Sequence, residues 1–423
     1  MKNIICCAIF LCLLFFSCKR DVEAPVPDLK WELFQSSAAG RLSARSFRAM
    51  EGVYAIEQGT EEFGAQAAAK WSYTASASDT VYHLSFFCER EGTYVICEGR
   101  RMDSVILLDG YWRRIVNTST GKVRLTISRD RGARAILRSG NLLPGDSLLA
   151  TGVYGIGNTI PDLPVQFRYT KPLYSATPFQ VLAHRGGGRT SDMLSASENS
   201  VEMIRLASRF GATGVEIDVK LTRDGTPVLF HDATLNERVT QKNGLVGPIE
   251  NYTYDQLYAL VKLVNGERIP TLRQALETVL YQTPLQFVWL DIKYANNMQA
   301  VRNLQAEFTQ KAEAANRKLE IVIGIPDKEV MANFKRLPVY QTIPSLVEYS
   351  VEEVNAVNAK IWAPQWTLGL QNSEVSGQQR EGRRVFTWTM DIEENVKQYM
   401  REGTFNGILT NYPSIVAYHY YVR

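Results

Sequence analysis

From residue 181 to the C-terminus, the chain alternates short apolar runs with amphipathic stretches. Runs such as VLAHRG, GVEIDVKLT, TPVLFHD, FVWLDIKY and LEIVIGIP are typical of buried strands, whereas stretches such as SENSVEMIRLASRFGA are typical of helices. A strand–helix order that repeats in this way indicates a sheet of parallel strands. Because the order continues over roughly 240 residues, close to the usual length of a TIM-type (β/α)8 barrel, we predict that barrel for residues 181–423. A doubly wound open sheet is the alternative.

The preceding segment, residues 47–161, has a different pattern. Short runs rich in Tyr, Val, Ile and Trp follow one another at close spacing, with turn residues between them and no lasting helical period. We therefore predict a small all-β domain, either an antiparallel barrel or a sandwich. Residues 162–180 contain three prolines and no clear period, so we predict that they link the two domains.

The N-terminus has the features of an export signal. A lysine precedes an apolar run over residues 4–16, which is shorter than a comfortable membrane-spanning helix, and a serine then precedes Cys18. This order resembles a bacterial lipoprotein signal, in which the cysteine is lipidated; an uncleaved anchor and an ordinary signal peptide are the alternatives. We expect residues 1–18 to be the signal, residues 19–46 a tether, and the protein to be exported and held at a membrane through lipid on Cys18.

The cysteines give little further information. Four of the six lie in the first 18 residues, which leaves Cys88 and Cys97 in the predicted all-β domain. An exported protein permits a disulfide between them, and two reduced, buried thiols are equally consistent with the sequence.

Polar residues stand at or near the ends of the predicted strands in the second half of the chain. In a TIM-type barrel the carboxyl ends of the strands surround the active site, and residues two apart point to the same side of a strand. We therefore expect these side chains to meet at one end of the barrel. They are His184, Arg185, Glu216, Asp218, His231, Asp291 and Lys293.

The types of these side chains suit a site that holds a cation and a phosphate group. Glu216, Asp218 and Asp291 offer hard oxygen ligands, which Ca²⁺ and Mg²⁺ prefer. Like charges this close together are costly without a counter-charge, so a divalent cation is the simplest partner.

The remaining polar side chains have roles around the phosphate. Arg185 and Lys293 can neutralise a phosphate, and His184 and His231 can form a general acid–base pair. We assign Trp388 to the wall of the substrate site, although a core position fits the sequence equally well.

Several motifs carry a resemblance to a known family. HRG at 184–186, SEN at 197–199, EIDV at 216–219, TRDGTPVLFHD at 222–232 and the later WTM and GILTNYP resemble the motifs of glycerophosphodiester phosphodiesterases. The resemblance covers residues 181 to about 416 and implies a TIM-type barrel, a divalent cation, and hydrolysis of a glycerophosphodiester to glycerol 3-phosphate and an alcohol.

The resemblance also assigns roles and shows two departures. It implies that the histidines of HRG and HD are the catalytic pair and that Glu216 and Asp218 bind metal. Its Glu-x-Lys motif aligns with Asp291-Ile292-Lys293, where Asp replaces the usual Glu. Asn411 stands where Asp is frequent, and we expect little catalytic consequence. Glu198 and Asn199 are expected to orient loops near HRG.

Two other functions fit the sequence. One is a phospholipase-D-like or sphingomyelinase-D-like activity on intact lipids, with which an Asp as third ligand agrees. The other is a ligand-binding or docking lipoprotein that acts through the all-β domain, whose protein partner the sequence does not identify. A formal charge of +3 without long runs of Lys and Arg argues against nucleic acid as a partner.

Overall fold

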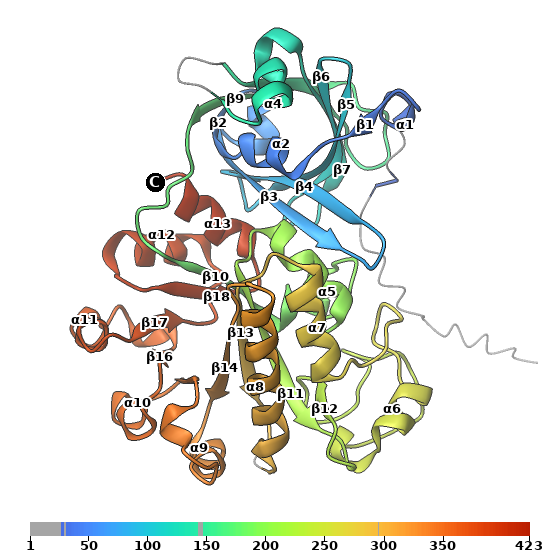
Figure 1. The fold of residues 1–423 in the computed structure, drawn as a ribbon. Helices are drawn as coiled ribbons and strands as arrows, with labels where there is room; N and C mark the ends of the chain where they lie inside the picture. Colours follow the sequence, from blue (N-terminus) through green and yellow to red (C-terminus); the bar gives the residue numbers. More distant parts are fainter. Residues whose placement is uncertain (1–26, 29–30, 143–146, 295) are drawn as a thin grey trace, which may run out of the picture.

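The computed structural model describes residues 27–28, 31–142, 147–294 and 296–423, which form two domains (Figure 1). The predicted signal, the lipidation site Cys18 and the first part of the tether lie outside the described residues. Among the residues that are described, no helix is long and apolar enough to cross a membrane.

The N-terminal domain is a closed antiparallel barrel, which confirms the prediction of an all-β domain and selects the barrel over the sandwich. Each strand pairs with the next along the chain, and the last pairs with the first. Apolar side chains, among them Phe63, Phe86, Trp112 and Phe167, fill its interior. The strands are β2 Gly52–Gln58, β3 Gln66–Ala75, β4 Thr80–Cys88, β5 Tyr94–Met102, β6 Val105–Arg113, β7 Thr120–Ile127, β8 Leu149–Tyr154 and β9 Leu163–Lys171.

The limits of this domain differ from the predicted ones. β9 lies inside the predicted linker and closes the barrel between β8 and β2. Its Pro164 misled the prediction, because proline is tolerated near the start of a strand when the following residues alternate, as buried Val165 and Phe167 do. The predicted tether is also structured from residue 31 onward: α1 Glu32–Gln35, β1 Gly40–Arg41 and α2 Ala44–Ala49 pack on the barrel.

Cys88 and Cys97 are both buried and free, so the disulfide that the sequence permitted is not formed. Burial raises the pKa of both thiols, which makes them unreactive packing groups.

The C-terminal domain is a closed parallel barrel surrounded by helices, which confirms the predicted TIM-type fold. Its strands are β10 Gln180–Ala183, β11 Gly214–Leu221, β13 Phe287–Ile292, β14 Glu320–Ile325, β15 Ser345–Val347, β16 Ile361–Trp362, β17 Arg384–Thr387 and β18 Gly407–Thr410. The helices are α5 Val201–Ala207, α6 Tyr254–Leu260, α7 Leu272–Gln282, α8 Met298–Ala314, α9 Lys328–Phe334, α10 Val351–Val357, α11 Asn372–Arg380, α12 Glu393–Glu402 and α13 Pro413–Tyr421.

Alternate residues along each strand of this domain belong to two separate parts of the core, the barrel interior and the layer beneath the helices. One set of side chains, including Leu182, Trp289, Leu346 and Leu409, fills the barrel interior. Their neighbours along each strand pack under the helices. A residue two positions beyond an interior side chain therefore points into the carboxyl-terminal mouth of the barrel.

The run TPVLFHD was predicted as a barrel strand, and the structure corrects this. β12, Pro227–Leu229, pairs antiparallel with the end of β11 and forms a hairpin outside the closed ring. The turn between them spans only residues 222–226, whereas parallel neighbours need a crossover of about a dozen residues or more. His231 thus reaches the mouth from a hairpin.

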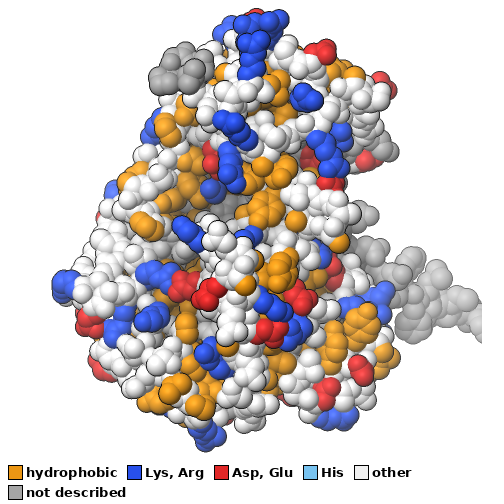
Figure 2. Space-filling model, in the orientation of Figure 1, with side chains coloured by type: hydrophobic (Ala, Val, Ile, Leu, Met, Phe, Trp, Pro, Cys, Tyr) orange, Lys and Arg blue, Asp and Glu red, His pale blue; other side chains and the backbone are white. Residues whose placement is uncertain are grey.

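The two domains share an apolar interface. The outer face of β3, β4 and β5 packs against α5, η4 (Ser208–Phe210) and α13 in one cluster that includes Phe87, Tyr94, Phe210 and Tyr418. On the surface of the C-terminal domain that faces the viewer in Figure 2, Lys and Arg side chains lie interspersed with Asp and Glu.

Candidate active site

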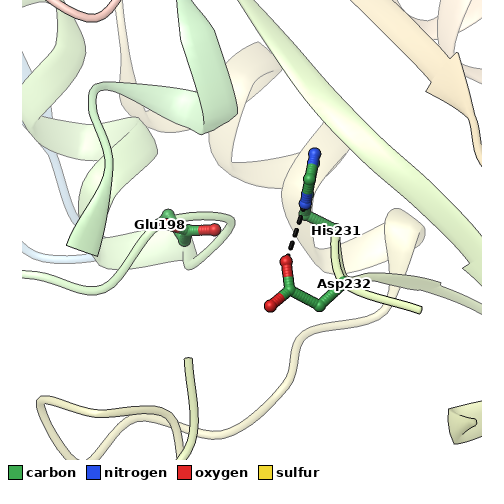
Figure 3. Close-up of side chains that lie close together, drawn as sticks. All are labelled: Glu198, His231 and Asp232. Atoms are coloured by element: carbon green, nitrogen blue, oxygen red, sulfur yellow. Dashed lines mark hydrogen bonds and ion pairs between the residues drawn. The ribbon is translucent and has the colours of Figure 1, made fainter. Parts of the chain in front are cut away.

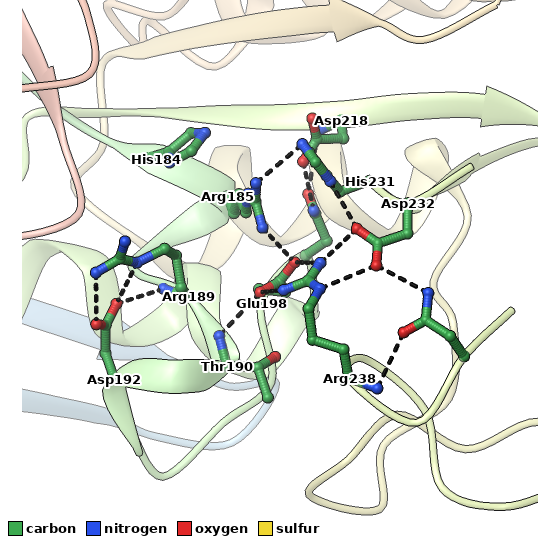
Figure 4. A network of polar contacts seen from close by, with 12 residues as sticks. His184, Arg185, Arg189, Thr190, Asp192, Glu198, Asp218, His231, Asp232 and Arg238 are labelled. Atoms are coloured by element: carbon green, nitrogen blue, oxygen red, sulfur yellow. Dashed lines mark hydrogen bonds and ion pairs between the residues drawn. The ribbon is translucent and has the colours of Figure 1, made fainter. Parts of the chain in front are cut away.

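The structure brings the predicted polar residues together at the mouth of the parallel barrel. His184 follows β10, two residues after the interior residue Leu182. Glu216 and Asp218 lie on β11, and Asp291 lies on the neighbouring strand β13, directly opposite Asp218. Figure 4 shows part of the resulting polar network at close range.

Three carboxylates form the centre of the mouth. Ligand oxygens of Glu216, Asp218 and Asp291 lie within 4.8 Å of one another, and all three residues are buried. One oxygen of each, namely Glu216 Oε1, Asp218 Oδ1 and Asp291 Oδ1, accepts no hydrogen bond. The shorter side chain of Asp291, compared with the Glu of the family motif, therefore still reaches the group. Among the described residues, Lys293 Nζ forms an ion pair with Asp218 Oδ1 at 3.3 Å, and the three buried oxygens fit the hard-ligand set of a divalent cation.

The three carboxyl groups differ in how the surrounding protein shifts their pKa values. Burial, and then the carboxylates of Asp218 and Asp291, raise the pKa of Glu216 well above its ordinary value. Burial and Asp218 likewise raise the pKa of Asp291. Burial also acts to raise the pKa of Asp218, but Lys293 and two histidines outweigh it and lower that pKa. A bound cation would stabilise the ionised form of all three.

His184 is held by a side chain that fixes which ring nitrogen carries the proton. Its Nδ1 lies 2.8 Å from Oδ1 of Asn411, whose amide nitrogen donates to Asp391 at 2.6 Å. Because the Asp391 carboxylate only accepts, the Asn411 oxygen faces His184, and His184 Nδ1 donates. The free Nε2 lies 3.8 Å from Glu216. Burial lowers the pKa of His184 to about 4, so the imidazole is neutral at pH 7.

His231 has a similar arrangement with a charged partner. Its Nδ1 donates to Asp232 at 2.8 Å (Figure 3), and its Nε2 accepts a hydrogen bond from Arg185 at 2.9 Å. Arg185 also donates to Glu198 at 2.8 Å, and its backbone N–H donates to Glu216. Both imidazoles thus carry a proton on Nδ1, held by a neutral amide in His184 and by a carboxylate in His231. Nε2 of His184 faces Glu216 at 3.8 Å, whereas Nε2 of His231 is occupied by the hydrogen bond from Arg185.

Comparisons with known proteins agree with this geometry. The model of the glycerophosphoryl diester phosphodiesterase family matches residues 184–415, which is more than half of the chain. The chain belongs to this family.

Individual relatives carry the same name. A glycerophosphodiester phosphodiesterase from Caldanaerobacter subterraneus is 25% identical over 55% of this chain and 94% of its own length. Glycerophosphodiester phosphodiesterase 1 from Rattus norvegicus is 37% identical, over 30% of this chain and 39% of the rat protein. A solved glycerophosphodiester phosphodiesterase structure from Parabacteroides distasonis is 23% identical with a TM-score of 0.44, and covers 57% of this chain and 96% of its own. A phosphodiesterase structure from Oleispira antarctica with the product sn-glycerol-3-phosphate is 22% identical, has a TM-score of 0.43, and covers 56% and 95% respectively.

Two predicted substrate groups of this phosphodiesterase also lie at the mouth. Lys293 forms ion pairs with Asp291 at 2.6 Å and with Asp218 at 3.3 Å. Trp388, two residues after the interior Phe386, covers the interior cluster and donates from its indole N–H to Ala363 at 2.7 Å. Its ring is therefore held in place at the edge of the mouth.

Side-chain hydrogen bonds hold together the loops around the phosphodiesterase site, and the sequence motifs include only some of the residues that form them. Asn199 exchanges hydrogen bonds with Asp218, through its amide nitrogen at 2.7 Å and its oxygen at 3.0 Å. Glu198 binds both Arg185 and Arg238. These contacts agree with the expectation that Glu198 and Asn199 orient the loops near His184.

Three residues that contribute to the site were given no role from the sequence alone. The guanidinium group of Arg238 donates hydrogen bonds to both Glu198 and Asp232 (Figure 4). Arg238 lies in a loop whose sequence has no periodic pattern, so no local feature of the sequence indicated this role. Asn411 was expected to matter little, yet it determines the tautomer of His184. Glu348 follows β15, a strand of three residues that was too short to predict.

Proposed function

We propose that this phosphodiesterase hydrolyses glycerophosphodiesters to glycerol 3-phosphate and an alcohol, with Ca²⁺ or Mg²⁺ as its cofactor. The observation that carries the proposal is the group of Glu216, Asp218 and Asp291, whose buried ligand oxygens lie within 4.8 Å of one another. These three residues would hold the cation. When bound, it would polarise the phosphate as a Lewis acid.

Arg185 and Lys293 bind the phosphate oxygens in this mechanism. Both side chains lie at the mouth, and Arg185 contacts His231 directly. Their positive charges neutralise the charge that develops on the phosphate in the transition state. Trp388 forms the wall against which the substrate lies.

The two imidazoles divide the proton transfers. Nε2 of His184 accepts the proton of the attacking hydroxyl, because Nδ1 already donates to Asn411. His231, whose Nδ1 donates to Asp232, gives a proton from Nε2 to the leaving alkoxide once Arg185 has turned from that nitrogen to the phosphate and the nitrogen has taken up a proton. One P–O bond forms to the nucleophile while the bond to the leaving alcohol breaks.

The nucleophile is either water or the glycerol 2-hydroxyl, and the products distinguish these two. Direct attack by water gives glycerol 3-phosphate, whereas attack by the hydroxyl gives a cyclic phosphate that is then opened. Product analysis of the protein without residues 1–18 tests the function. Glycerophosphocholine, glycerophosphoethanolamine and glycerophosphoinositol are supplied with Ca²⁺ or Mg²⁺, and with a chelator as control.

We expect metal-dependent release of glycerol 3-phosphate. If none of these substrates turns over while intact phospholipid or sphingomyelin does, the proposal fails and the intact-lipid alternative replaces it. The relatives described above are named for glycerophosphodiesters, which favours the first outcome.

We also propose that the enzyme is exported and held at a membrane by lipid on Cys18. The order of charged, apolar and small residues before Cys18 supports this. Cys18→Ser should move the enzyme from the membrane fraction to the soluble fraction and abolish incorporation of labelled fatty acid. Membrane association of the variant equal to that of the wild type would contradict the proposal.

The alternative of a ligand-binding lipoprotein has less support. Side chains fill the interior of the N-terminal barrel, which argues against a ligand site inside it.

A further inference from the structure

Glu348 is an ionisable side chain at the mouth of the barrel to which the proposed mechanism gives no role. It directly follows β15, and Leu346, two residues earlier, belongs to the barrel interior. By the two-residue period of the strand, Glu348 points into the mouth, as His184 and Asp291 do on their strands. Its side chain is only 7% exposed.

The carboxylate of Glu348 is incompletely bonded. Its Oε1 is buried and accepts no hydrogen bond. On the neighbouring strand β16 the register places Ala363 level with Glu348, and an alanine side chain cannot donate. A buried carboxylate oxygen without a donor is costly, so its presence in a substrate site indicates a donor from the ligand.

The position of Glu348 argues against a fourth metal ligand. The three carboxylates of Glu216, Asp218 and Asp291 have oxygens within 4.8 Å of one another, and Glu348 is outside this group. Burial, and then the charge of Asp291, raise the pKa of Glu348 well above its ordinary value, and Lys293 opposes this shift, which places the carboxyl group beside the phosphate site. In its ionised form this group repels the phosphate and can only accept hydrogen bonds. The complementary ligand group is therefore a hydroxyl attached close to the phosphate.

We propose that Glu348 accepts a hydrogen bond from a hydroxyl of the substrate's glycerol moiety and so selects diesters that contain glycerol. This inference rests on the proposed function, because it assumes that a glycerophosphodiester occupies the mouth.

Glu348→Gln, which keeps the shape of the side chain, tests the inference. The substrates are glycerophosphocholine, its analogues that lack the primary or the secondary glycerol hydroxyl, and bis(4-nitrophenyl) phosphate, which has no hydroxyl. We expect the ratio of kcat/KM for glycerophosphocholine to that for bis(4-nitrophenyl) phosphate to fall about 10- to 100-fold, as for loss of a charged hydrogen bond. The analogue that lacks the bound hydroxyl should be a poor substrate already, and the variant should not weaken it further.

Glu352→Gln is the matched control, because Glu352 is exposed in the first turn of α10 and should leave this ratio unchanged. Thermal unfolding of both variants verifies that they fold, and Glu348→Ala gives a second measurement at the same position.

Three results would overturn the inference. An unchanged substrate ratio in folded Glu348→Gln would show that Glu348 does not contact the glycerol. An equal loss on all substrates would indicate a catalytic role instead. A loss with glycerophosphocholine but not with glycerophosphoinositol would mean that Glu348 binds the cationic head group. If the wild type hydrolyses only bis(4-nitrophenyl) phosphate, the proposed function itself has failed, and the inference fails with it.

Discussion

At the scale of single residues, the site depends on how each imidazole is supported. Asn411 holds Nδ1 of His184 with a neutral oxygen, while Asp232 holds Nδ1 of His231 with a charged one. The two rings therefore carry the proton on the same nitrogen but have supporting partners of different charge.

The first prediction concerns the two histidines. His184→Ala and His231→Ala should each lower kcat by about 10²- to 10⁴-fold, because each removes one proton-transfer step. Steady-state hydrolysis of glycerophosphocholine measures the effect. His83→Ala is the control, since His83 lies in β4 of the other domain. Near-normal turnover by either active-site variant would exclude that histidine from the mechanism.

The second prediction concerns the pH dependence of stability. Burial lowers the pKa of His184 to about 4 from an ordinary 6.5, so the unfolded chain takes up a proton at a higher pH than the folded one. The stability linked to this group is therefore fully present above pH 6.5 and is lost as the pH falls toward 4. Relative to His184→Asn, the wild type should lose about 2 kcal/mol of unfolding free energy between pH 7 and pH 4.5. Urea unfolding at both values measures this, and a constant difference would contradict it.

At the scale of elements, neighbouring strands β11 and β13 place the acidic group. Their parallel register sets Asp218 opposite Asp291 and Glu216 opposite Trp289. Trp289 fills the interior below the group, and a side chain at Gly324 would collide with it, because a Cβ there would lie 2.3 Å from the indole nitrogen. The interior packing thus supports the carboxylates from beneath.

The third prediction follows from that group of carboxylates. Ca²⁺ or Mg²⁺ should raise the melting temperature, because binding relieves the repulsion among three buried acids. At 100 times the dissociation constant the gain is about 2.7 kcal/mol. Asp218→Asn should abolish most of this gain, whereas Asp224→Asn, in the hairpin turn, should retain it. Calorimetry with and without the metal measures the shift, and an equal shift in both variants would place the metal elsewhere.

At the scale of the whole molecule, the N-terminal barrel supports the mouth of the phosphodiesterase barrel. Arg113, at the end of β6, is buried and donates to the carbonyls of Met193, at 2.7 Å, and Asp192. These residues belong to the loop between HRG and SEN, and Thr190 of that loop donates to Glu198. At the opposite end of the barrel, Arg317 joins Tyr73 to the start of β13 through hydrogen bonds of 2.6 and 3.0 Å.

The fourth prediction compares these two contacts between the domains. Arg113→Ala and Arg317→Ala should each cost about 1–3 kcal/mol of stability, because each removes two part-buried hydrogen bonds of a guanidinium group. Only Arg113→Ala should also lower kcat/KM, by about 10-fold or more, since its loop adjoins Arg185 and Glu198. Equal effects of both substitutions on kcat/KM would show that Arg113 has a structural role only.

The alternation of strands and helices predicted the barrel, and the two-residue period within the strands predicted most of the side chains at its carboxyl-terminal mouth. In strands, alternate residues face the same side, so HRG, EID and DIK indicated which side chains point into the mouth. This reasoning holds because backbone geometry is local. The same rule failed for TPVLFHD, where the short turn forces an antiparallel hairpin, and it missed Glu348, because β15 is too short to show a period.

The sequence by itself determined the fold class, the acidic group, the two histidines and the two cations, since motif spacing and strand period are local properties. Only the tertiary structure decided the limits of the N-terminal barrel, the tautomer of His184, the fork of Arg238 and the contact of Arg113 with the loop at the mouth. Each of these depends on residues far apart in the chain, such as His184 and Asn411. Hydrogen bonds between distant residues leave no periodic trace, so they become visible only when the chain has folded.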